Sequence, residues 1–443
     1  MTASPQPTLR IALACGGTGG HLFPGLAVAE ALSRRACVVT LIVSPKEVDQ
    51  RALENVQGIE VLTLPAIGLT RGRRLAFVRA FWQSYRAARE WFRKTSPNAV
   101  LAMGGFTAAA PLVAGKRAGA ATFIHESNTI PGRANRWLSR IVDGAFVGFP
   151  SAADRLRARN VTVTGTPVRS QFTARDAAYC RRALGLEPNR PVVLIMGGSQ
   201  GAHGINSLVL ESLPSLVKSA PDWQWLHLTG PDDYEPVKQA YASARVSAAV
   251  HPFFDQMELA LGAAAAALSR AGASSLAELA AVRVPSVLIP YPAATDNHQL
   301  HNARAFVETG AALMLEQNTA TAEILVPLLV KLMQDSAARE SMQTALAQWH
   351  RPDAADQIVA GMLDSLQASA HQRDLRIQND TGRSTDRPRS SRAAPHQDRN
   401  NASPFAPDLN STKAPAPAPL SSSRGEGLGE RKHLYSSVTS TPA

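Results

Sequence analysis

The chain has 443 residues, a formal net charge of +11 at pH 7 and three cysteines. This length exceeds what a single ordinary hydrophobic core accommodates, so two domains are expected. Cys15, Cys37 and Cys180 lie far apart and form no Cys-x-x-Cys pair, which argues against a disulfide framework or a zinc site and favours a reducing compartment. The positive charge favours anionic partners such as a nucleotide or a phospholipid surface, and no unbroken apolar run predicts a membrane-spanning helix.

Short apolar runs alternate with amphipathic stretches through most of the chain. Strands that alternate with helices in this way form βαβ units and parallel sheets. We therefore predict an α/β fold with two doubly wound, Rossmann-like domains that face each other across a cleft, where ligands bind at the carboxyl ends of the strands. The predicted strands are 9–14, 38–43, 59–64, 99–103, 120–125 and 144–148, followed by 192–196, 224–229, 247–251, 266–269 and 286–289.

The two series of strands set the expected domain boundaries. The first domain is expected at 1–164 and the second at 165–350, with a helix at 351–370 that returns to the first domain. Residues 371–443 are rich in Ser, Pro, Arg and Asn, and such a segment buries too little apolar surface to offset its ordering entropy. We predict that this tail is disordered and has no catalytic role.

A glycine-rich loop, Gly-Gly-Thr-Gly-Gly-His at 16–21, follows the first predicted strand. Glycines let a ligand approach the backbone, and a helix that begins there presents free N–H groups and the positive end of its dipole. We interpret the loop as a site for phosphate or another anion, although a tight turn without a ligand has the same pattern. A P-loop would need Gly-Lys-Ser/Thr, and a dinucleotide fingerprint would need a glycine at Leu22, so both are disfavoured.

Two further small-residue loops lie in the second half of the chain. The loop at 197–202 fails the same two tests, which also disfavours a nicotinamide-dependent enzyme. The loop at 272–275 leads into a predicted helix, and Glu278 in its first turns is well placed to bond a ribose diol. A surface glutamate that complements the helix dipole is the alternative interpretation.

Polar side chains crowd into 296–302, after the last predicted strand of the second series. Asp296, His298, Gln299, His301 and Asn302 supply the donors and acceptors that sugar hydroxyls need. The pattern Asp-x-His-x-x-His also permits a metal site, but Gln and Asn dilute it and no further ligand cluster appears. We therefore favour sugar binding.

In combination, these motifs resemble the MurG family of bacterial cell-wall synthesis. The resemblance covers roughly residues 8–368 and implies the two-domain GT-B fold, with the first domain on the acceptor and membrane side and the second binding a UDP-sugar. It depends on the order and spacing of GGTGGH (16–21), GGF (104–106), HESN (125–128), GTPVR (165–169), GGSQGA (197–202), GASSLAE (272–278) and DNHQLHNA (296–303).

The resemblance also implies a reaction. N-acetylglucosamine would pass from UDP-N-acetylglucosamine to the muramyl 4-hydroxyl of lipid I, an undecaprenyl-diphosphate-linked muramyl pentapeptide, with inversion at the anomeric carbon. The product would be lipid II, made by a peripheral protein on the cytoplasmic face of the inner membrane. No cofactor and no nucleic-acid partner are implied.

Carried over residue by residue, the resemblance places donor contacts in both domains. Phe254 would lie at the uracil, mostly through its backbone, and Glu278 would hold the ribose hydroxyls. The implied contacts are Thr18, Gly19, Gly20, Asn128, Arg169, Ser199, Phe254, Ala273, Ser274, Ser275, Leu276, Ala277, Glu278 and Gln299.

Inversion by direct displacement requires a base near the acceptor hydroxyl and groups that stabilise the departing UDP. His21 follows the first glycine loop, and His125 and Glu126 end a first-domain strand, so all three are candidate bases. A buried strand-end His125 and a Glu126 that only pairs with a cation are the structural alternatives. The chain contains no Asp-x-Asp, so we expect helix N-termini and Arg169 to hold the leaving group, with no obligatory metal.

The segment 70–94 combines arginines with aromatic and aliphatic residues at helical spacing. A basic amphipathic helix with aromatics is typical of binding to an anionic membrane surface. An ordinary domain helix with its aromatics in the core is the alternative, and one face must pack inward in either case.

Other functions remain open from the residues alone. A related GT-B transferase would glycosylate another lipid, and a UDP-sugar 2-epimerase of the same fold would convert the donor without an acceptor. A non-catalytic binding module is disfavoured because polar residues from both domains converge on one cleft. A nucleic-acid binder is disfavoured because no stripe of aromatics lies among basic residues.

Overall fold

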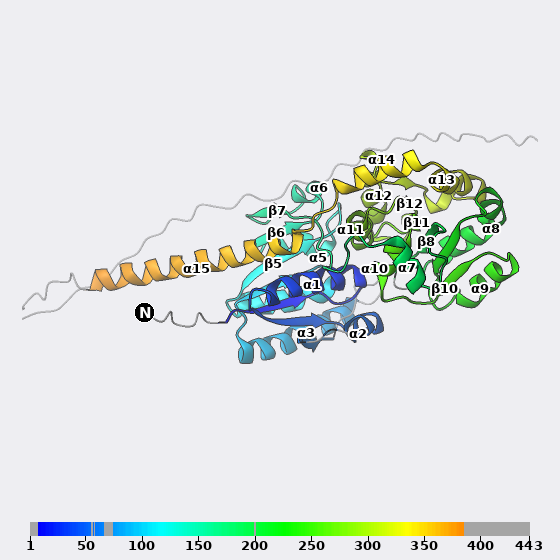
Figure 1. The fold of residues 1–443 in the computed structure, drawn as a ribbon. Coiled ribbons are helices and arrows are strands. Elements are labelled where there is room, and N and C mark those ends of the chain that lie inside the picture. The colour runs from blue at the N-terminus through cyan, green and yellow to red at the C-terminus, as the bar shows by residue number, and fades with distance from the viewer. Residues whose placement is uncertain (1–7, 55, 57, 66–73, 199–200, 385–443) are drawn as a thin grey trace, which may run out of the picture. The chain divides into compact units, whose positions relative to one another are not determined.

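The computed structural model describes residues 8–54, 56, 58–65, 74–198 and 201–384. It contains two parallel sheets flanked by helices, one in each half of the described chain (Figure 1). The predicted doubly wound α/β architecture is thus confirmed.

The first sheet has seven parallel strands in the order β3-β2-β1-β4-β5-β6-β7. Its inner strands are continuous apolar runs, as expected for a sheet with helices on both faces. The strands are β1 (Arg10–Ala14), β2 (Val38–Val43), β3 (Glu60–Thr63), β4 (Ala99–Ala102), β5 (Ala121–Glu126), β6 (Gly144–Val147) and β7 (Val161–Val163). The helices are α1 (Gly19–Ser33), α2 (Glu47–Leu53), α3 (Arg74–Thr95), α4 (Ala109–Arg117), α5 (Arg133–Leu138) and α6 (Pro150–Ala153), with a 3₁₀ turn η1 (Phe106–Ala108).

The second sheet has six parallel strands in the order β10-β9-β8-β11-β12-β13. Its strands are β8 (Val192–Met196), β9 (Gln224–Leu228), β10 (Ala248–His251), β11 (Ala266–Ser269), β12 (Ser286–Leu288) and β13 (Leu313–Met314). The helices are α7 (Ala177–Ala183), α8 (His203–Ser219), α9 (Tyr234–Ser243), α10 (Met257–Ala263), α11 (Ala273–Val282), α12 (His298–Glu308), α13 (Ala322–Gln334) and α14 (Ser336–Ala347), with 3₁₀ turns η2 (Thr295–Asn297) and η3 (Gln317–Thr319).

Both sheets reverse their strand order at one point. The reversal falls between β1 and β4 in the first sheet and between β8 and β11 in the second. The loops that follow these strands at their carboxyl ends form the ligand crevice of a doubly wound fold. The three small-residue loops described above and the glycine pair at 104–105 each follow one of these four strands: 16–20 after β1, 104–105 after β4, 197–201 after β8 and 272–275 after β11.

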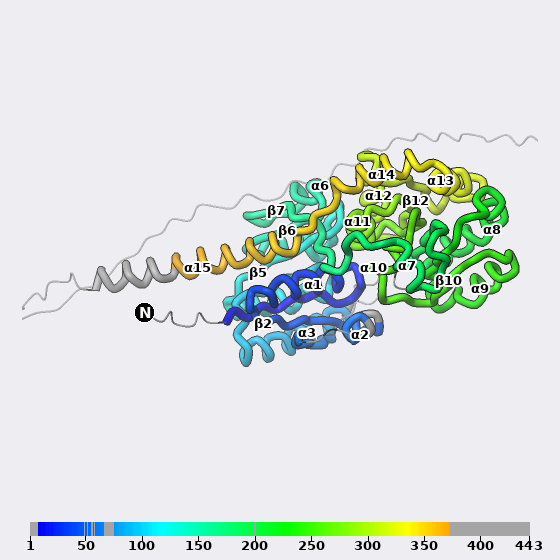
Figure 2. The backbone as a smooth tube through the Cα atoms, viewed as in Figure 1, coloured from blue at the N-terminus to red at the C-terminus, as the bar shows by residue number. Residues whose placement is uncertain are grey.

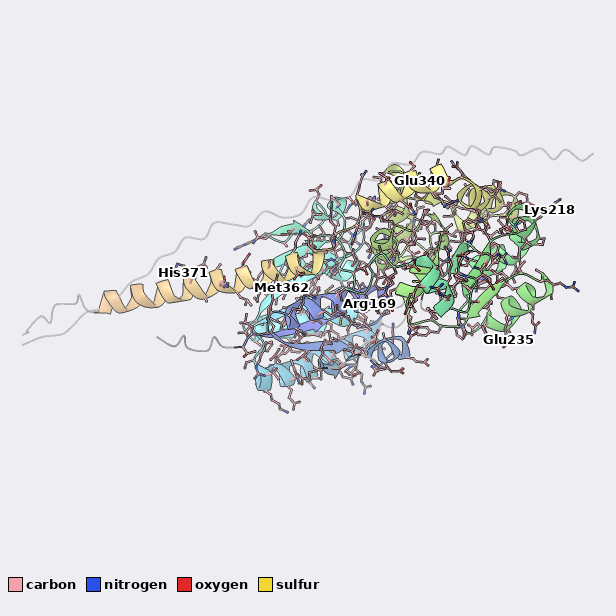
Figure 3. The ribbon with its side chains drawn as sticks, viewed as in Figure 1. Arg169, Lys218, Glu235, Glu340, Met362 and His371 are labelled. Carbon is pink, nitrogen blue, oxygen red and sulfur yellow. The ribbon has the colours of Figure 1, made fainter. Side chains whose placement is uncertain are left out.

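The last helix, α15 (Ala354–Ser384), connects the two halves of the fold. Its buried Ile358, Val359 and Met362 belong to the same apolar cluster as Leu22 of α1 and Leu41 of β2. Figure 2 shows the chain passing from α14 into α15, which then runs beside the first sheet, and Figure 3 labels Met362 on this helix. The C-terminal part of the chain therefore covers one face of the N-terminal sheet.

The structure differs from the sequence predictions at three places. Strands β7 and β13 were not among the predicted strands, because each is very short and β7 lies at a partly exposed sheet edge. Residues 371–384, predicted to be disordered, continue helix α15, so this part of the prediction is wrong. The rest of the predicted tail, 385–443, lies outside the described residues.

Candidate functional site

A cavity of about 1170 Å³ lies where the carboxyl ends of the two sheets face each other. Loops from both sheets line it, including those after β1, β5, β8 and β11. The cavity is large enough for a nucleotide-sugar together with part of a second substrate, since pockets for drug-sized ligands measure roughly 300–1,000 Å³.

The first glycine loop is held partly by the protein's own groups. A Cβ on Gly16 would lie 2.4 Å from the backbone N of Ser44, so the glycine is required by its packing against β2. The N–H of Gly17 donates to Oδ2 of buried Asp49 at 2.6 Å. The prediction that the whole loop faces an anion therefore needs correction, because the Gly17 amide is already bonded to Asp49, while Thr18, Gly19 and Gly20 line the cavity.

His21 lies at the start of α1 and lines the cavity. Its imidazole packs so closely on the loop after β4 that a Cβ on Gly104 would come within 2.8 Å of Nδ1. Gly104 also has φ +117°, which strongly favours glycine there. Burial lowers the pKa of His21, and the negative charge of Glu126 acts in the opposite direction. The balance favours a neutral imidazole, the form that accepts a proton.

His125 is the next-to-last residue of β5 and does not line the cavity. It is fully buried, its Nε2 lies 3.1 Å from the carbonyl oxygen of Gly165, and its Nδ1 lies 3.3 Å from Oγ of Ser127. Burial lowers the pKa of His125 to about 4. Because both ring nitrogens are engaged inside the protein, this geometry favours the structural interpretation of His125.

Glu126 reaches the edge of the cavity, but protein donors surround its carboxylate. Oε1 accepts from the backbone N and the side-chain Nδ2 of Asn128, at 2.9 and 3.1 Å. Oε2 accepts from the backbone N of Gly132 at 2.9 Å and from Nδ2 of Asn135 at 3.0 Å. Four hydrogen bonds occupy the usual acceptor capacity of a carboxylate. Glu126 therefore organises the loop that carries Asn128.

The loop at 272–275 begins α11 at the opposite wall of the cavity. Gly272, Ala273, Ser274 and Ser275 line the cavity, so the N-terminus of α11 faces it. Oγ of Ser274 donates to the carbonyl oxygen of Gly20 at 3.0 Å and so joins this loop to the first glycine loop. The helix N-terminus offers backbone donors and a positive dipole end to an anionic ligand.

Leu276 and Ala277 do not line the cavity. Leu276 is buried in the core of the second sheet, so its side chain is structural. These two residues belong to α11, but only the side of the helix that carries Glu278 turns toward the cavity.

Glu278 and Arg169 form an ion pair at the cavity wall, with Nη2 and Oε1 3.8 Å apart. Arg169 also lies over the ring of Phe23 at 4.4 Å and near that of Phe172 at 5.0 Å. Figure 3 labels Arg169 at the junction of the two halves of the fold. Burial raises the pKa of Glu278 to about 7, Arg169 opposes this rise, and Glu258 adds to it.

Gln299 and Phe254 complete the second-domain wall. Oε1 of Gln299 accepts from the backbone N–H groups of Ala271 and Tyr291, at 3.2 and 3.0 Å. These two hydrogen bonds fix the orientation of the Gln299 amide, whose N–H groups can then bind a ligand. The ring of Phe254 packs on His251 with centroids 5.1 Å apart. The predicted contact Ser199 lies outside the described residues.

Arg270 is a cavity residue that the sequence analysis missed. It follows β11, is 7% exposed, and donates from Nη1 to the carbonyl oxygens of Ile289 and Pro290 at 3.1 and 3.3 Å. Burial lowers its pKa to about 10, so it remains cationic at neutral pH. Arg270 could have been identified from the sequence by its position between the end of a strand and a glycine turn.

The polar cluster at 296–302 divides between two roles. Asp296, His298 and Gln299 line the cavity. Asp296 also pairs with Arg136 at 2.6 Å and with Arg133 at 3.4 Å. Asn302 is fully buried, so the prediction that the whole cluster meets sugar hydroxyls is wrong for this residue.

The structure thus brings most predicted site residues together around one cavity. These are Thr18, Gly19, Gly20, His21, Glu126, Asn128, Arg169, Phe254, Ala273, Ser274, Ser275, Glu278 and Gln299. Within the described ranges, no group of three His, Cys, Asp or Glu side chains is placed to hold a metal ion.

Helix α3 presents a mixed apolar and basic face. Leu75 is 87% exposed, and Val78 and Trp82 are each 50% exposed. These residues follow a helical spacing, and Arg79 and Arg86 on the same helix are also exposed. Residues 70–73 of the predicted basic segment lie outside the described part of the chain. No helix among the described residues combines the length and apolarity that crossing a bilayer demands.

Family models match both halves of the chain. Residues 11–147 match the glycosyltransferase family 28 N-terminal domain, and residues 192–358 match the glycosyltransferase family 28 C-terminal domain. The first match extends from β1 to β6, and the second contains β8 to β13.

Two curated relatives carry the name UDP-N-acetylglucosamine–N-acetylmuramyl-(pentapeptide) pyrophosphoryl-undecaprenol N-acetylglucosamine transferase. The protein of Nitratidesulfovibrio vulgaris (strain Hildenborough) is 37% identical over 370 residues, which cover 82% of this chain and all of that protein. That of Anaeromyxobacter dehalogenans (strain 2CP-1) is 35% identical over 367 residues, which cover 79% of this chain and 91% of that protein.

Solved structures give the same result. The crystal structure of Acinetobacter baumannii MurG superimposes with a TM-score of 0.63 at 27% identity, covering 81% of this chain and all of that one. A putative UDP-N-acetylglucosamine 2-epimerase from Listeria monocytogenes, at 15% identity and a TM-score of 0.59, shares the fold alone. The chain belongs to the MurG family of glycosyltransferase family 28, with the two-domain GT-B fold.

Proposed function

We propose that this protein transfers N-acetylglucosamine from UDP-N-acetylglucosamine to the muramyl 4-hydroxyl of lipid I, giving lipid II and UDP. The observation that carries the proposal is that His21, the N-terminus of α11 and Glu278 line the same cavity. Relatives at 35–37% identity bear the name of this transferase. We also propose that residues 1–164 form the acceptor side and residues 165–350 the UDP-sugar side.

The second-domain wall suits the donor nucleotide. Glu278 in its carboxylate form accepts hydrogen bonds from the two ribose hydroxyls, and the segment at 252–254 lies at the uracil. The diphosphate lies at the N-terminus of α11, where Ser274 and Ser275 add hydroxyl donors. Gln299 meets the sugar through its free amide N–H groups.

His21 is the best placed of the three candidate bases. In the proposed step, the acceptor hydroxyl loses its proton to His21 while its oxygen attacks the anomeric carbon of the donor. The new bond is oxygen to anomeric carbon, and the broken bond joins that carbon to the UDP oxygen. His125 is withdrawn from the cavity, and Glu126 holds the loop of Asn128.

Fixed positive groups stabilise the departing UDP. Arg270 and Arg169 line the cavity as cations, and the dipole of α11 adds partial positive charge. Because these groups are held in place by protein contacts, little reorganisation accompanies the development of charge. The reaction is accordingly proposed to proceed without an obligatory metal ion.

The lipid tail of the acceptor places the reaction at a membrane surface. We propose that α3 binds the cytoplasmic face of the inner membrane as a peripheral contact, through exposed Leu75, Val78 and Trp82 and the arginines beside them. Apolar side chains enter the interface, while each nearby basic residue adds about 1 kcal/mol at an anionic surface.

The proposal is tested by comparing acceptors. UDP release from UDP-N-acetylglucosamine is measured with a lipid I analogue, with undecaprenyl phosphate and with no acceptor. We expect release only with the lipid I analogue. Release with a lipid that lacks the muramyl sugar would favour a related transferase and contradict the proposed acceptor.

A further inference from the structure

Asn302 lies where the two halves of the fold meet, in the first turns of α12. Its side chain is fully buried and is absent from the cavity lining. Oδ1 accepts from the backbone N and from Oγ1 of Thr129, at 2.9 and 3.0 Å. Nδ2 donates to Oδ1 of Asn128 at 3.0 Å and to the carbonyl oxygen of Ala271 at 3.2 Å. One amide thus joins a first-sheet loop to a second-sheet loop.

The groups that Asn302 joins belong to opposite walls of the cavity. Asn128 is held on its other side by the carboxylate of Glu126. Ala271 directly precedes the Gly272 turn into α11, and its N–H donates to Gln299. A continuous chain of hydrogen bonds therefore runs from Glu126 through Asn128 and Asn302 to the loop proposed to bind the diphosphate.

The ion pairs that Asp296 forms between the two walls are more exposed. Asp296 pairs with Arg136 through side chains that are 31% and 45% exposed. Water and salt screen such pairs, so they fix a distance weakly. A buried amide with four hydrogen bonds is different, because moving the walls apart would leave buried polar groups unpaired, which is unfavourable.

We infer that Asn302 is a positioning residue that sets the spacing between the Asn128 loop and the N-terminus of α11, and thereby the alignment of acceptor and donor. The inference rests on the proposed transfer reaction. Asn302 touches neither substrate and acts through Asn128 and Ala271. A misplacement of about 1 Å between reacting groups can cost on the order of 10²-fold in rate.

The test compares two buried amides that make the same number of hydrogen bonds. Asn302→Ala removes the link between the walls. Gln224→Ala is the matched control: Gln224 is fully buried, accepts from Glu187 N and Ser247 Oγ, and donates to the carbonyl oxygens of Glu187 and Arg190. Gln224 begins β9, at the end of the strand opposite the cavity. Both variants lose stability, so kcat is measured in the folded fraction.

We expect Asn302→Ala to lower kcat by about 10- to 100-fold while the Kd for UDP changes by less than about threefold. Gln224→Ala is expected to lower the midpoint of thermal unfolding with kcat nearly unchanged. A kcat for Asn302→Ala within about threefold of wild type, or an equal loss in Gln224→Ala, would overturn the inference.

A milder pair of variants keeps the test valid if Asn302→Ala does not fold. Thr129→Val removes the hydroxyl that bonds Asn302 and preserves the side-chain shape, whereas Thr129→Ser keeps the hydroxyl. We expect turnover to fall in Thr129→Val and to be largely retained in Thr129→Ser, and equal turnover in the two would count against the inference. An inactive wild-type enzyme would instead refute the proposed function and this inference with it.

Discussion

Arg169 and Glu278 meet at the cavity wall with Nη2 and Oε1 3.8 Å apart, and their side chains are only 13% and 12% exposed. Arg169 belongs to the connection between the two sheets, and Glu278 to α11. At 3.8 Å the pair lacks the short contact of a direct charge-assisted hydrogen bond. Glu278 is therefore a buried carboxyl whose charge is only partly compensated until a ligand arrives.

Stability should depend on pH through Glu278. Burial raises its pKa from 4.5 to about 7. Between these values the folded protein keeps a proton that the unfolded chain has released, so Glu278 lowers the free energy of unfolding as pH rises. Glu278→Gln should remove this loss and be more stable than wild type above pH 7, by on the order of 3 kcal/mol. Chemical denaturation at pH 5 and pH 8 measures the difference.

The control for this measurement is Glu340→Gln, which changes an exposed glutamate of α14 (Figure 3). This variant removes the same kind of carboxyl from the surface, so it separates the effect of burial from that of the substitution. If the stability difference between Glu278→Gln and wild type did not change with pH, the proposed burial of a titrating carboxyl would be wrong.

The carboxylate of Glu278 should strengthen UDP binding, although its burial destabilises the fold. A ribose diol donates to a carboxylate, and hydrogen bonds to charged groups are worth about 1.5–3 kcal/mol. Glu278→Ala should therefore weaken UDP binding by roughly 10- to 100-fold. Isothermal titration calorimetry gives the affinity, with Glu235→Ala, on α9 of the same domain, as the control. An unchanged Kd for Glu278→Ala would remove Glu278 from the nucleotide site.

His21 is expected to act on the chemical step. His21→Ala should lower kcat by about 10²–10⁴-fold if the imidazole accepts the acceptor proton. Because burial lowers the pKa of His21, the activity of wild type should fall only at pH values below the usual pKa range of histidine. This decrease in activity at low pH should be absent in His21→Ala. His371→Ala, at an exposed position on α15 (Figure 3), is the control. A His21→Ala enzyme with near-normal kcat would exclude His21 as the base.

Much of the fold could be predicted from the sequence because its inner strands are continuous apolar runs. All eleven predicted strands correspond to observed ones, including the buried β1, β4 and β8. Strands β7 and β13 are too short to be recognised from their sequence pattern. The part of α15 after residue 370 was missed because its composition resembles that of a disordered tail.

The position of the candidate site could be predicted from the sequence, but the directions of its side chains were harder to predict. Glycine loops after parallel strands indicated the cleft, and His21 lies in it. The direction of a strand-end side chain depends on tertiary contacts, and His125 turns to the carbonyl oxygen of Gly165. The role of Asn302 depends on Thr129, which is 173 positions away in the chain, so local pattern alone could not reveal it.

If α3 binds the membrane, binding should depend on the positive charge of this helix. Arg79→Glu combined with Arg86→Glu should reduce co-sedimentation with anionic liposomes and make the residual binding less sensitive to salt. Arg155→Glu with Arg159→Glu changes two exposed arginines elsewhere in the first domain by the same total charge and serves as the control. Equal loss in both variants would indicate nonspecific attraction, and unchanged binding in the first would exclude α3 as the contact.

Sugar transfer between two substrates in this cavity can be followed directly with a radiolabel in the sugar of UDP-N-acetylglucosamine, with and without a lipid I analogue. We expect the label to enter the lipid product with release of UDP, and the donor to stay unchanged without acceptor. Conversion of the labelled donor to its 2-epimer in the absence of acceptor, with no labelled lipid in its presence, would instead show that the protein is an epimerase.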